Sequence, residues 1–539
     1  MLAAVILPFI FLAQTIRQGP LIPNKDKKEI VSYIGTTDSS FFVQRVDEKR
    51  STLRYIERYN KATLKKDLEV AIDMEMEGLT VRPDMKPGIV FLSGKTVYVF
   101  YNAYQKETKK YFLLLQTVST EGKKSESVKE VTSIQLESYD DFGAGDFILT
   151  LSPDASKLLF INELRFLKKE SRVTACLYDI TDFHKIYEKN LPGSYSGSQM
   201  LSENYIVDNS GNIAYTFYYL TEHKKFPLNI YKFGYAACLV PAGVLASDIV
   251  VKELDFNEHK QEPLGVNVFL RNGKLEIVGL FIDTKKGDDG HRNPGMFFIQ
   301  IDVASKKEDF QTIEYFSEEW RKKLYNSFLK YSETPELKYQ VFLNETEDGF
   351  IVSAFRAYNP YTVKDPADLY YYKDRLSAVK TIAGMKPMFT MRDAQKFYST
   401  GKWNVQNSTI ISFSKEGKLR WVKPIYINMQ SNYGYVNLFY VNNKMHYVYN
   451  DHLFNIKKID VNSMEKNDTY YTIEREYGEV NTICLSFDKE GKAERTVIQS
   501  NKDMGFLTIG DGFMLSKNQL LTFFRKYEKE NFSVITFDK

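Results

Sequence analysis

The chain has 539 residues, with 72 basic and 69 acidic side chains and a formal net charge of +3. This near-balance argues against a nucleic-acid-binding protein, whose contact face needs a basic excess. Hydrophobic residues make up 43% of the chain, which allows a large core, and the aromatic share of 14% suits half-buried strands.

The first 13 residues are wholly apolar, and polar sequence begins at Gln14. The run is too short to cross a bilayer as a helix, but it matches the apolar core of a secretory signal peptide. We therefore expect 1–13 to be a signal peptide cleaved after Ala13, with no transmembrane segment in the mature chain. The protein is then exported, to the periplasm, the outer membrane or the cell exterior. The alternative is an apolar N-terminal strand.

Short strand patterns joined by turns follow in groups along the chain. The first of them lie at 41–46, 53–59, 64–70, 89–92, 96–101, 111–115 and 131–136. Further groups occupy 145–190, 202–254, 264–315, 339–425, 434–498 and 503–539. Asp, Asn, Ser and Gly separate the strands, as turn geometry requires. Continuous apolar runs such as Leu158–Ile161 indicate strands buried on both faces.

One hairpin pattern recurs: a strand, a turn with Gly-Lys, and a second strand. The clearest copies are Thr409–Lys423 and Thr482–Ile498, and looser relatives are Leu149–Phe160 and Ile206–Phe217. A recurring hairpin indicates a repeat architecture. Groups of about four strands, roughly 50–85 residues apart, fit the blades of a β-propeller, in which radial stacking buries both faces of each sheet.

The sequence therefore predicts an all-β fold: a single β-propeller domain over 29–539, with seven or eight four-stranded antiparallel blades. We expect the ring to close by pairing between strands from the two ends of the chain. One long insert, 357–407, and one short helix between blades, 317–331, interrupt the rhythm. The helix has Ser317 as its N-cap and apolar residues at every fourth position from Trp320.

The segment Gly417-Lys418-Leu419-Arg420-Trp421 resembles the Gly-Lys-x-x-Trp repeat of quinoprotein-like β-propellers. At the second hairpin, Arg495 stands where the Trp is expected. The resemblance implies the β-propeller superfamily, with quinoprotein-like or WD40-like repeats, and no specific functional family. A quinone-dependent dehydrogenase finds no cofactor signature to support it.

Motifs for catalysis, metal binding or cofactor binding are missing from the sequence. None of the six histidines forms His-Glu-x-x-His, the three cysteines are far apart, and no glycine-rich phosphate loop occurs. His446 and His452 flank Asp451, and we interpret both as surface histidines. We expect no metal, no cofactor and no catalytic residue.

The propeller resemblance implies that ligands meet the face that carries the connections between second and third strands and between blades. The long candidate connections are 283–295, 317–331, 357–407 and 451–479. Asp283, Asp288, Asp289 and His291 in the first of these could hold a cation, but Lys285, Lys286 and Arg292 oppose one, which favours a solvated turn. Aromatic and basic residues in these segments are typical of binding surfaces. The candidate binding residues are His291, Arg292, Trp320, Tyr358, Tyr361, Tyr370, Tyr371, Tyr372 and Trp403.

The favoured hypothesis is a non-catalytic binding or scaffold module that engages a protein or glycan partner in the bacterial cell envelope. The alternative is a polysaccharide lyase or glycoside hydrolase with its carboxylates in the central funnel. Two inward carboxylates, or a His–Tyr–Arg cluster at the channel mouth, would favour the enzyme.

Overall fold

A computed structural model of the chain gives the fold. It describes residues 14–23, 28–47, 49–50, 52–81, 90–136, 145–164, 172–191, 200–224, 230–243, 249–254, 261–283, 293–318, 338–358, 404–430, 437–458, 480–500, 508–509, 512–526 and 529–537. Residues 1–13, and most of the expected helix at 317–331, lie outside this part. Within it, no helix is long and apolar enough to cross a bilayer.

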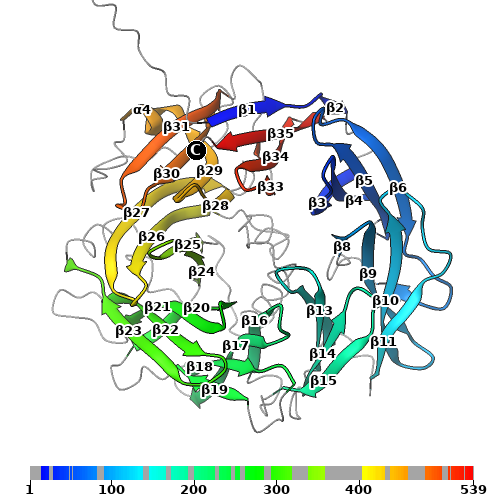
Figure 1. Cartoon of the computed structure of the whole chain (residues 1–539), viewed down its shortest axis with the longest axis horizontal. Coiled ribbons are helices and arrows are strands. Elements are labelled where there is room, and N and C mark those ends of the chain that lie inside the picture. The colour runs from blue at the N-terminus through cyan, green and yellow to red at the C-terminus, as the bar shows by residue number, and fades with distance from the viewer. Residues whose placement is uncertain are drawn as a thin grey trace, which may run out of the picture.

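Eight antiparallel sheets are arranged radially as the blades of a propeller (Figure 1). The first four blades take up the N-terminal half of the chain. Blade 1 contains β3 (Lys28–Thr36), β4 (Ser40–Asp47), β5 (Leu53–Asn60) and β6 (Lys66–Asp73). Blade 2 contains β7 (Thr80–Val81), β8 (Val90–Ser93), β9 (Thr96–Gln105), β10 (Lys110–Ser119) and β11 (Lys129–Gln135). Blade 3 contains β12 (Gly145–Leu151), β13 (Lys157–Leu164), β14 (Arg172–Asp179) and β15 (Lys185–Asn190). Blade 4 contains β16 (Met200–Val207), β17 (Ile213–Lys224), β18 (Ile230–Val240) and β19 (Val250–Glu253).

The remaining blades complete the ring. Blade 5 contains β20 (Gln261–Arg271), β21 (Lys274–Asp283), β22 (Pro294–Asp302) and β23 (Glu308–Tyr315). Blade 6 contains β24 (Lys338–Glu345), β25 (Gly349–Tyr358), β26 (Asn404–Ser414) and β27 (Leu419–Gln430). Blade 7 contains β28 (Asn437–Val441), β29 (Lys444–His452), the helix α4 (Leu453–Lys458), β30 (Val480–Phe487) and β31 (Ala493–Ser500). Blade 8 contains β32 (Thr508–Ile509), β33 (Phe513–Ser516), β34 (Gln519–Lys526) and β35 (Lys529–Phe537), joined by β1 (Gln14–Gln18) and β2 (Ile22–Pro23).

The fold confirms the expected propeller and fixes the number of blades at eight. The opening run of strand patterns, from 41 to 136, forms two blades. The helix α4 lies inside blade 7, between its second and third strands. Among the described residues, no other blade contains a helix.

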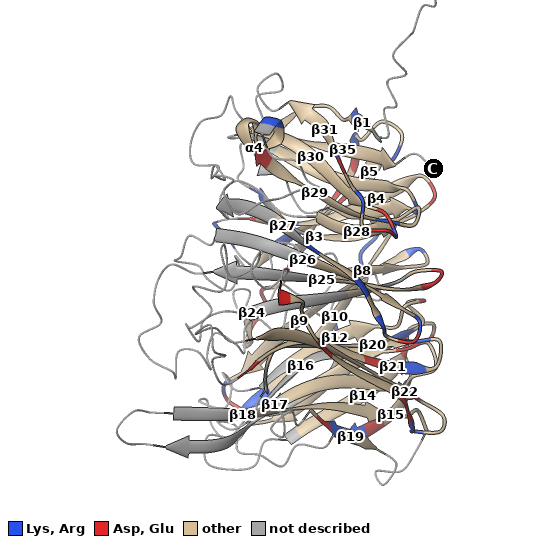
Figure 2. Ribbon diagram, turned by 90° about the vertical axis from the view of Figure 1, so that its left-hand side faces the viewer, with Lys and Arg blue, Asp and Glu red and all other residues tan. Residues whose placement is uncertain are grey.

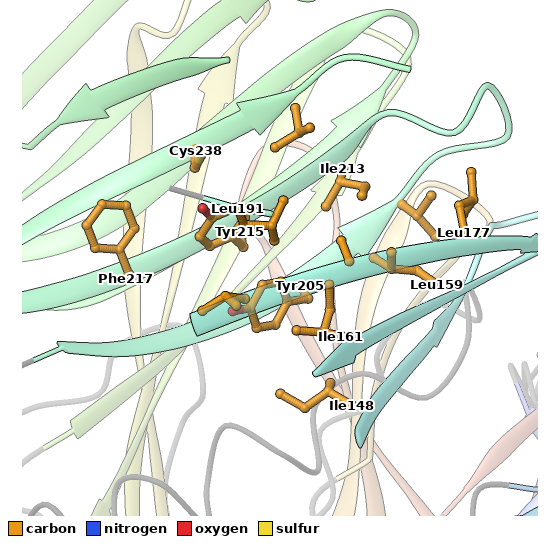
Figure 3. Packing of buried hydrophobic residues seen from close by; sticks show 14 of the residues in the cluster. Ile148, Leu159, Ile161, Leu177, Leu191, Tyr205, Ile213, Tyr215, Phe217 and Cys238 are labelled. Carbon is orange, nitrogen blue, oxygen red and sulfur yellow. The ribbon is translucent and has the colours of Figure 1, made fainter. Parts of the chain in front are cut away.

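The inner strands bury apolar side chains on both faces of a sheet, since neighbouring residues of a strand point to opposite sides. Leu158 and Phe160 pack between blades 2 and 3, while Leu159 and Ile161 pack between blades 3 and 4. Figure 3 shows the second of these clusters. The eight clusters of buried side chains correspond to the eight interfaces between neighbouring blades. The continuous apolar run of residues 158–161 is therefore buried on both faces of the strand, as predicted from the sequence.

The ring closes in blade 8, where β1 from the N-terminal part of the chain forms the outermost strand. It pairs antiparallel with β35, from Gln14 opposite Phe537 to Gln18 opposite Ser533 (Figure 1). Its neighbour Gly19 donates its backbone N–H to the carbonyl of Phe532 at 2.8 Å. Closure by strands from the two ends of the chain was predicted from the sequence and is confirmed.

A buried charge network joins blade 8 to blade 1. Arg45 on β4 pairs with Glu57 on β5, with Nε 2.5 Å from Oε2, and with Glu530 on β35. Tyr59 donates its hydroxyl to Glu57 at 2.6 Å. Burial alone lowers the pKa of Arg45, but the charged and polar groups around it, Glu530 and Glu57 among them, outweigh burial and raise that pKa. The guanidinium therefore stays charged inside the interface.

The Gly-Lys hairpins join third to fourth strands. At each of them, a side chain of the preceding blade packs against the glycine. Gly491, with φ +78°, lies beneath the ring of Trp421 from the preceding blade, and the indole Nε1 donates to the carbonyl of Lys489 at 2.8 Å. Gly417 lies in the same way beneath Phe310, and Gly122 beneath Leu68. Each of these glycines precedes a lysine. The looser relatives at 149–160 and 206–217 are first-to-second hairpins and belong to a different part of the blade.

We predict that Gly491→Ala destabilises the propeller by about 1–3 kcal/mol more than Gly94→Ala. Both glycines have positive φ, at +78° and +57°, so both substitutions carry the backbone cost. Only at Gly491 would the new Cβ meet another group, at 2.8 Å from the Trp421 ring, since nothing lies within 4 Å at Gly94. Urea unfolding of both variants measures the difference. Equal midpoints would contradict the role of Gly491 in making room for the Trp421 ring.

Candidate binding face

The two faces of the propeller differ in the length of their connections. One face, here called the turn face, carries the first-to-second and third-to-fourth turns, and its first-to-second turns span no more than 208–212 or 152–156. The opposite loop face carries the second-to-third and interblade connections. Its longest are 284–293, 316–337, 359–403 and 453–479, all in blades 5 to 7. The short turns gather along the right-hand edge in Figure 2, and α4 lies on the other side.

The sequence placed these long connections correctly between strands. The candidate residues His291, Arg292, Trp320, Tyr361, Tyr370, Tyr371, Tyr372 and Trp403, with Asp288 and Asp289, lie outside the described residues. Tyr358 is the last residue of β25, opposite Asn404 at the start of β26. The insert thus leaves and re-enters blade 6 at paired positions.

A three-residue clamp holds the stem of the blade 5 connection. Asp283 accepts a hydrogen bond from the side chain of Asn293 at 3.0 Å and another from the hydroxyl of Tyr315 at 2.8 Å. The backbone N–H of Asp283 also donates to the Asn293 carbonyl. Asp283, a possible cation ligand by sequence, therefore closes the neck of the loop. The described residues contain no group of three or more His, Cys, Asp or Glu placed to hold a metal ion.

A second clamp fixes α4 where it leaves blade 7. One carboxyl oxygen of Asp451 accepts from the backbone N–H of His452 and from the side-chain amide of Asn455, both at 2.8 Å. Burial raises the pKa of Asp451, against the opposing effect of Asn455 and Arg495. Sequence reasoning flagged Asp451 only as a neighbour of two histidines, and its pairing with Asn455 is a local signal that could have been found.

Arg495 completes this clamp from β31. Its Nη1 donates to the carbonyls of Asn455 at 3.1 Å and Ile456 at 3.2 Å. A cation suits these carbonyls, because the last turns of a helix expose unsatisfied acceptors. Arg495 occupies the position of the missing Trp in the second hairpin. In this blade the Arg binds carbonyl groups of α4, which a Trp side chain would not do in the same way.

Two aromatic side chains stand partly exposed beside these stems. Tyr315 is 47% exposed, and Phe454 on α4 is 37% exposed. Tyr315 also packs edge-on against Phe281, with ring centroids 5.2 Å apart. Aromatic groups held by a fixed scaffold suit contacts with proteins and sugars. Sequence reasoning did not select either residue.

One His–Ser–Cys cluster resembles catalytic components but lies inside the ring. His446 is only 4% exposed, so the prediction of a surface histidine was wrong. Its Nε2 lies 3.2 Å from the Val441 carbonyl and therefore carries the proton, and Nδ1 accepts from the Ser486 hydroxyl at 2.7 Å. Cys484 Sγ is 3.6 Å from Nδ1.

The surroundings of His446 exclude a substrate. The imidazole lies between the rings of Phe439 and Phe537, at centroid distances of 5.4 and 4.8 Å, in the interface of blades 7 and 8. Burial lowers its pKa to about 4, and Lys444 adds to this while the hydrogen bond to Val441 opposes it. The imidazole is therefore neutral at pH 7 and structural.

Known proteins resemble this chain only distantly. No protein-family model matches the chain, and no curated protein matches its sequence. The β-propeller domain of the Trilobed protease from Pyrococcus furiosus is similar, with a TM-score of 0.34 and 9% identity, covering 88% of this chain and 97% of that one. A europium-containing methanol dehydrogenase has a TM-score of 0.33 and 8% identity, covering 94% and 84%.

An α-L-arabinofuranosidase of Fusarium graminearum, in complex with arabinobiose, has a TM-score of 0.27 and 10% identity, covering 52% of this chain and 90% of that one. The similar chains include the β-propeller domain of a protease, a dehydrogenase and an α-L-arabinofuranosidase, so they share no single activity. At these identities and TM-scores they carry no argument about function. The eight-bladed architecture rests on the strand pairing itself.

We predict that acid destabilises the propeller through His446. The folded-state pKa of about 4 lies below the ordinary value of 6.5, so the unfolded chain takes up the proton first. Stability due to this group is complete above pH 6.5 and falls as the pH drops toward 4, by about 3 kcal/mol in all. Urea midpoints of wild type and His446→Phe, measured from pH 7 to 4, test this. An equally steep decline in both proteins would contradict it.

A second prediction separates the charge of Asp451 from its role as acceptor. Asp451→Asn keeps the oxygen that accepts from His452 and Asn455 and removes a buried ionisable group, so its unfolding free energy should change little. Asp451→Ala leaves those donors without their acceptor and should cost about 1–3 kcal/mol. Urea unfolding of the two variants measures the costs, and an Asn variant as unstable as the Ala variant would show that the charge itself is needed.

Proposed function

We propose that this protein is an exported, non-catalytic binding or scaffold module that engages a protein or glycan partner in the cell envelope through its loop face. The observation that supports this most directly is the asymmetry of the two faces. Connections of up to 45 residues, such as 359–403, gather on one side of three consecutive blades, whereas the longest on the turn face are 120–128 and 241–249. Long loops on a fixed scaffold are the usual carriers of binding.

The stems add support because they are held rigidly. Asp283 closes the blade 5 stem, and Asp451 with Arg495 fixes α4. Polar residues that hold loops in place are what a binding surface needs in order to present its contacts in a fixed geometry. Export rests on the apolar segment 1–13.

The enzymatic alternative, a polysaccharide lyase or glycoside hydrolase, needs reachable ionisable groups. The closest cluster of suitable types is Arg45, Glu57, Tyr59 and Glu530, and each of these residues is at most 2% exposed. The cluster lies between blades 8 and 1, where a glycan chain has no access. The burial of this cluster among the described residues therefore favours a structural role for it over a catalytic one.

The test compares two variants that remove features from opposite faces. In the first, a short Gly-Ser linker replaces 359–403, which is feasible because Tyr358 and Asn404 are paired neighbours. In the second, Lys415 and Lys489 on turn-face hairpins are changed to Ala. Wild type and both variants are immobilised and challenged with glycan arrays and with envelope extract from the native host.

We predict that the loop-face variant loses a partner that wild type and the turn-face variant retain in equal amount. Point variants refine the result: Tyr315→Ala should weaken binding more than Tyr315→Phe, which keeps the ring. Equal capture by all proteins would refute the loop face as the binding surface. Turnover of a glycan by wild type would instead support the hydrolase or lyase.

A further inference from the structure

The outermost strand of blade 8 is attached differently from the outer strands of the other blades. In blades 1 to 7, the outermost strand follows its neighbour through a turn of the same chain, as β27 follows β26. β1 instead comes from the opposite end of the sequence and joins β35 only by non-covalent pairing. Its covalent neighbour, through Pro23 and Lys28, is blade 1.

The contacts that hold β1 are few. It has five residues, and β2 adds two more pairs at the far end of β35. Thr15 and Arg17 are exposed, whereas Ile16 and Ile22 are the apolar side chains that pack against the neighbouring clusters. A segment whose apolar side chains are only partly buried is the type of element that opens locally while the rest stays folded.

The remaining contacts are polar and do not depend on which copy of the chain supplies the strand. Arg17 Nη2 donates to the Lys61 carbonyl at 2.8 Å, and Gln18 donates to the side chain of Gln499 at 2.7 Å. Beside β1, Gly19 fits under Leu64, whose Cβ lies 2.7 Å from the place a Cβ on Gly19 would take. An identical segment from a second molecule would make every one of these contacts.

Release of β1 exposes the backbone groups of β35 along a buried strand. An open edge of this kind pairs readily with an extended segment of matching pattern. The segment from residue 14 to 27 reaches at most about 45 Å when extended, enough to cross to a molecule whose blade 8 faces it. Within one molecule the strand returns at a high effective concentration, so exchange is favoured by high protein concentration.

We propose that β1 is a strand-exchange element, so that two copies of the chain associate by completing each other's blade 8. The partner is a second copy, since residues 14–23 already pair with this edge of β35 in a defined register. The two copies would be related by a two-fold axis, with their seams facing each other. Strand exchange would occur whether or not the loop face binds a partner.

The test uses two variants of the full chain, each with one added cysteine. Thr15 and Thr536 lie directly opposite each other in the β1–β35 pairing, and both are at least partly exposed. Thr15→Cys and Thr536→Cys proteins are mixed at high concentration, incubated and oxidised. A disulfide between the two molecules requires β1 of one to pair with β35 of the other. The native thiols give little background, because Cys238 and Cys484 are buried and burial raises the pKa of Cys176 to about 12.

The matched control mixes Thr15→Cys with Lys529→Cys, an exposed position at the far end of β35 opposite Pro23. Random collision would link both mixtures equally, whereas exchange predicts a several-fold excess of linked dimer in the Thr536→Cys mixture. The double variant Thr15→Cys/Thr536→Cys should form an intramolecular disulfide, which shows that the pair can be bridged. If it does so while the two mixtures give equal amounts of dimer, the proposal is wrong.

Discussion

The pairing of β1 with β35 turns a row of eight sheets into a closed ring. Without it, blade 8 has no outer strand, and blades 8 and 1 meet through side-chain contacts such as Arg45–Glu530 without a shared strand. Each sheet has two apolar faces, so each needs a neighbour on both sides. The ring in which every blade has a neighbour on both sides is therefore closed by a short strand that buries little apolar surface.

Apolar faces alone do not specify which sheets should meet, since one surface of Val, Ile, Leu and Phe packs much like another. The seam between blades 8 and 1 contains Arg45, whose charge is balanced by Glu57 of its own blade and by Glu530 of blade 8. Wrong stacking would leave at least one charge buried without its partner, at a cost of about 3–5 kcal/mol. The glycines at positions 122, 417 and 491 also favour the correct order of blades, because each leaves room for a large side chain from the preceding blade.

Local patterns made the propeller predictable. Short strand patterns and continuous apolar runs located the strands, and turn residues separated them, since these signals lie within a few residues of sequence. The blade count stayed at seven or eight because nothing in the 41–136 run marks where one sheet ends and the next begins. The two kinds of hairpin looked alike for the same reason, and only strand order distinguishes them.

The candidate binding face was predictable in place but less so in its residues. Long connections were visible as breaks in the rhythm, whereas the clamps that hold them join distant positions. Asp451 and Arg495 are brought together by the register of β29, β30 and β31, and a single sequence does not reveal this register. His446 was misread because its burial depends on Phe537, which lies far away in the chain but next to it in space.

The register of β1 on β35 also determines how the ring responds to mechanical force. Gln14 is opposite Phe537, so the two ends of the paired region emerge at the same point of the rim. A pull that separates residues 14 and 537 loads the hydrogen bonds of this pair one after another. Such unzipping needs far less force than shearing all of them at once. The propeller would therefore yield first at its seam when pulled through these positions, while blades 2 to 6 bear almost none of the load.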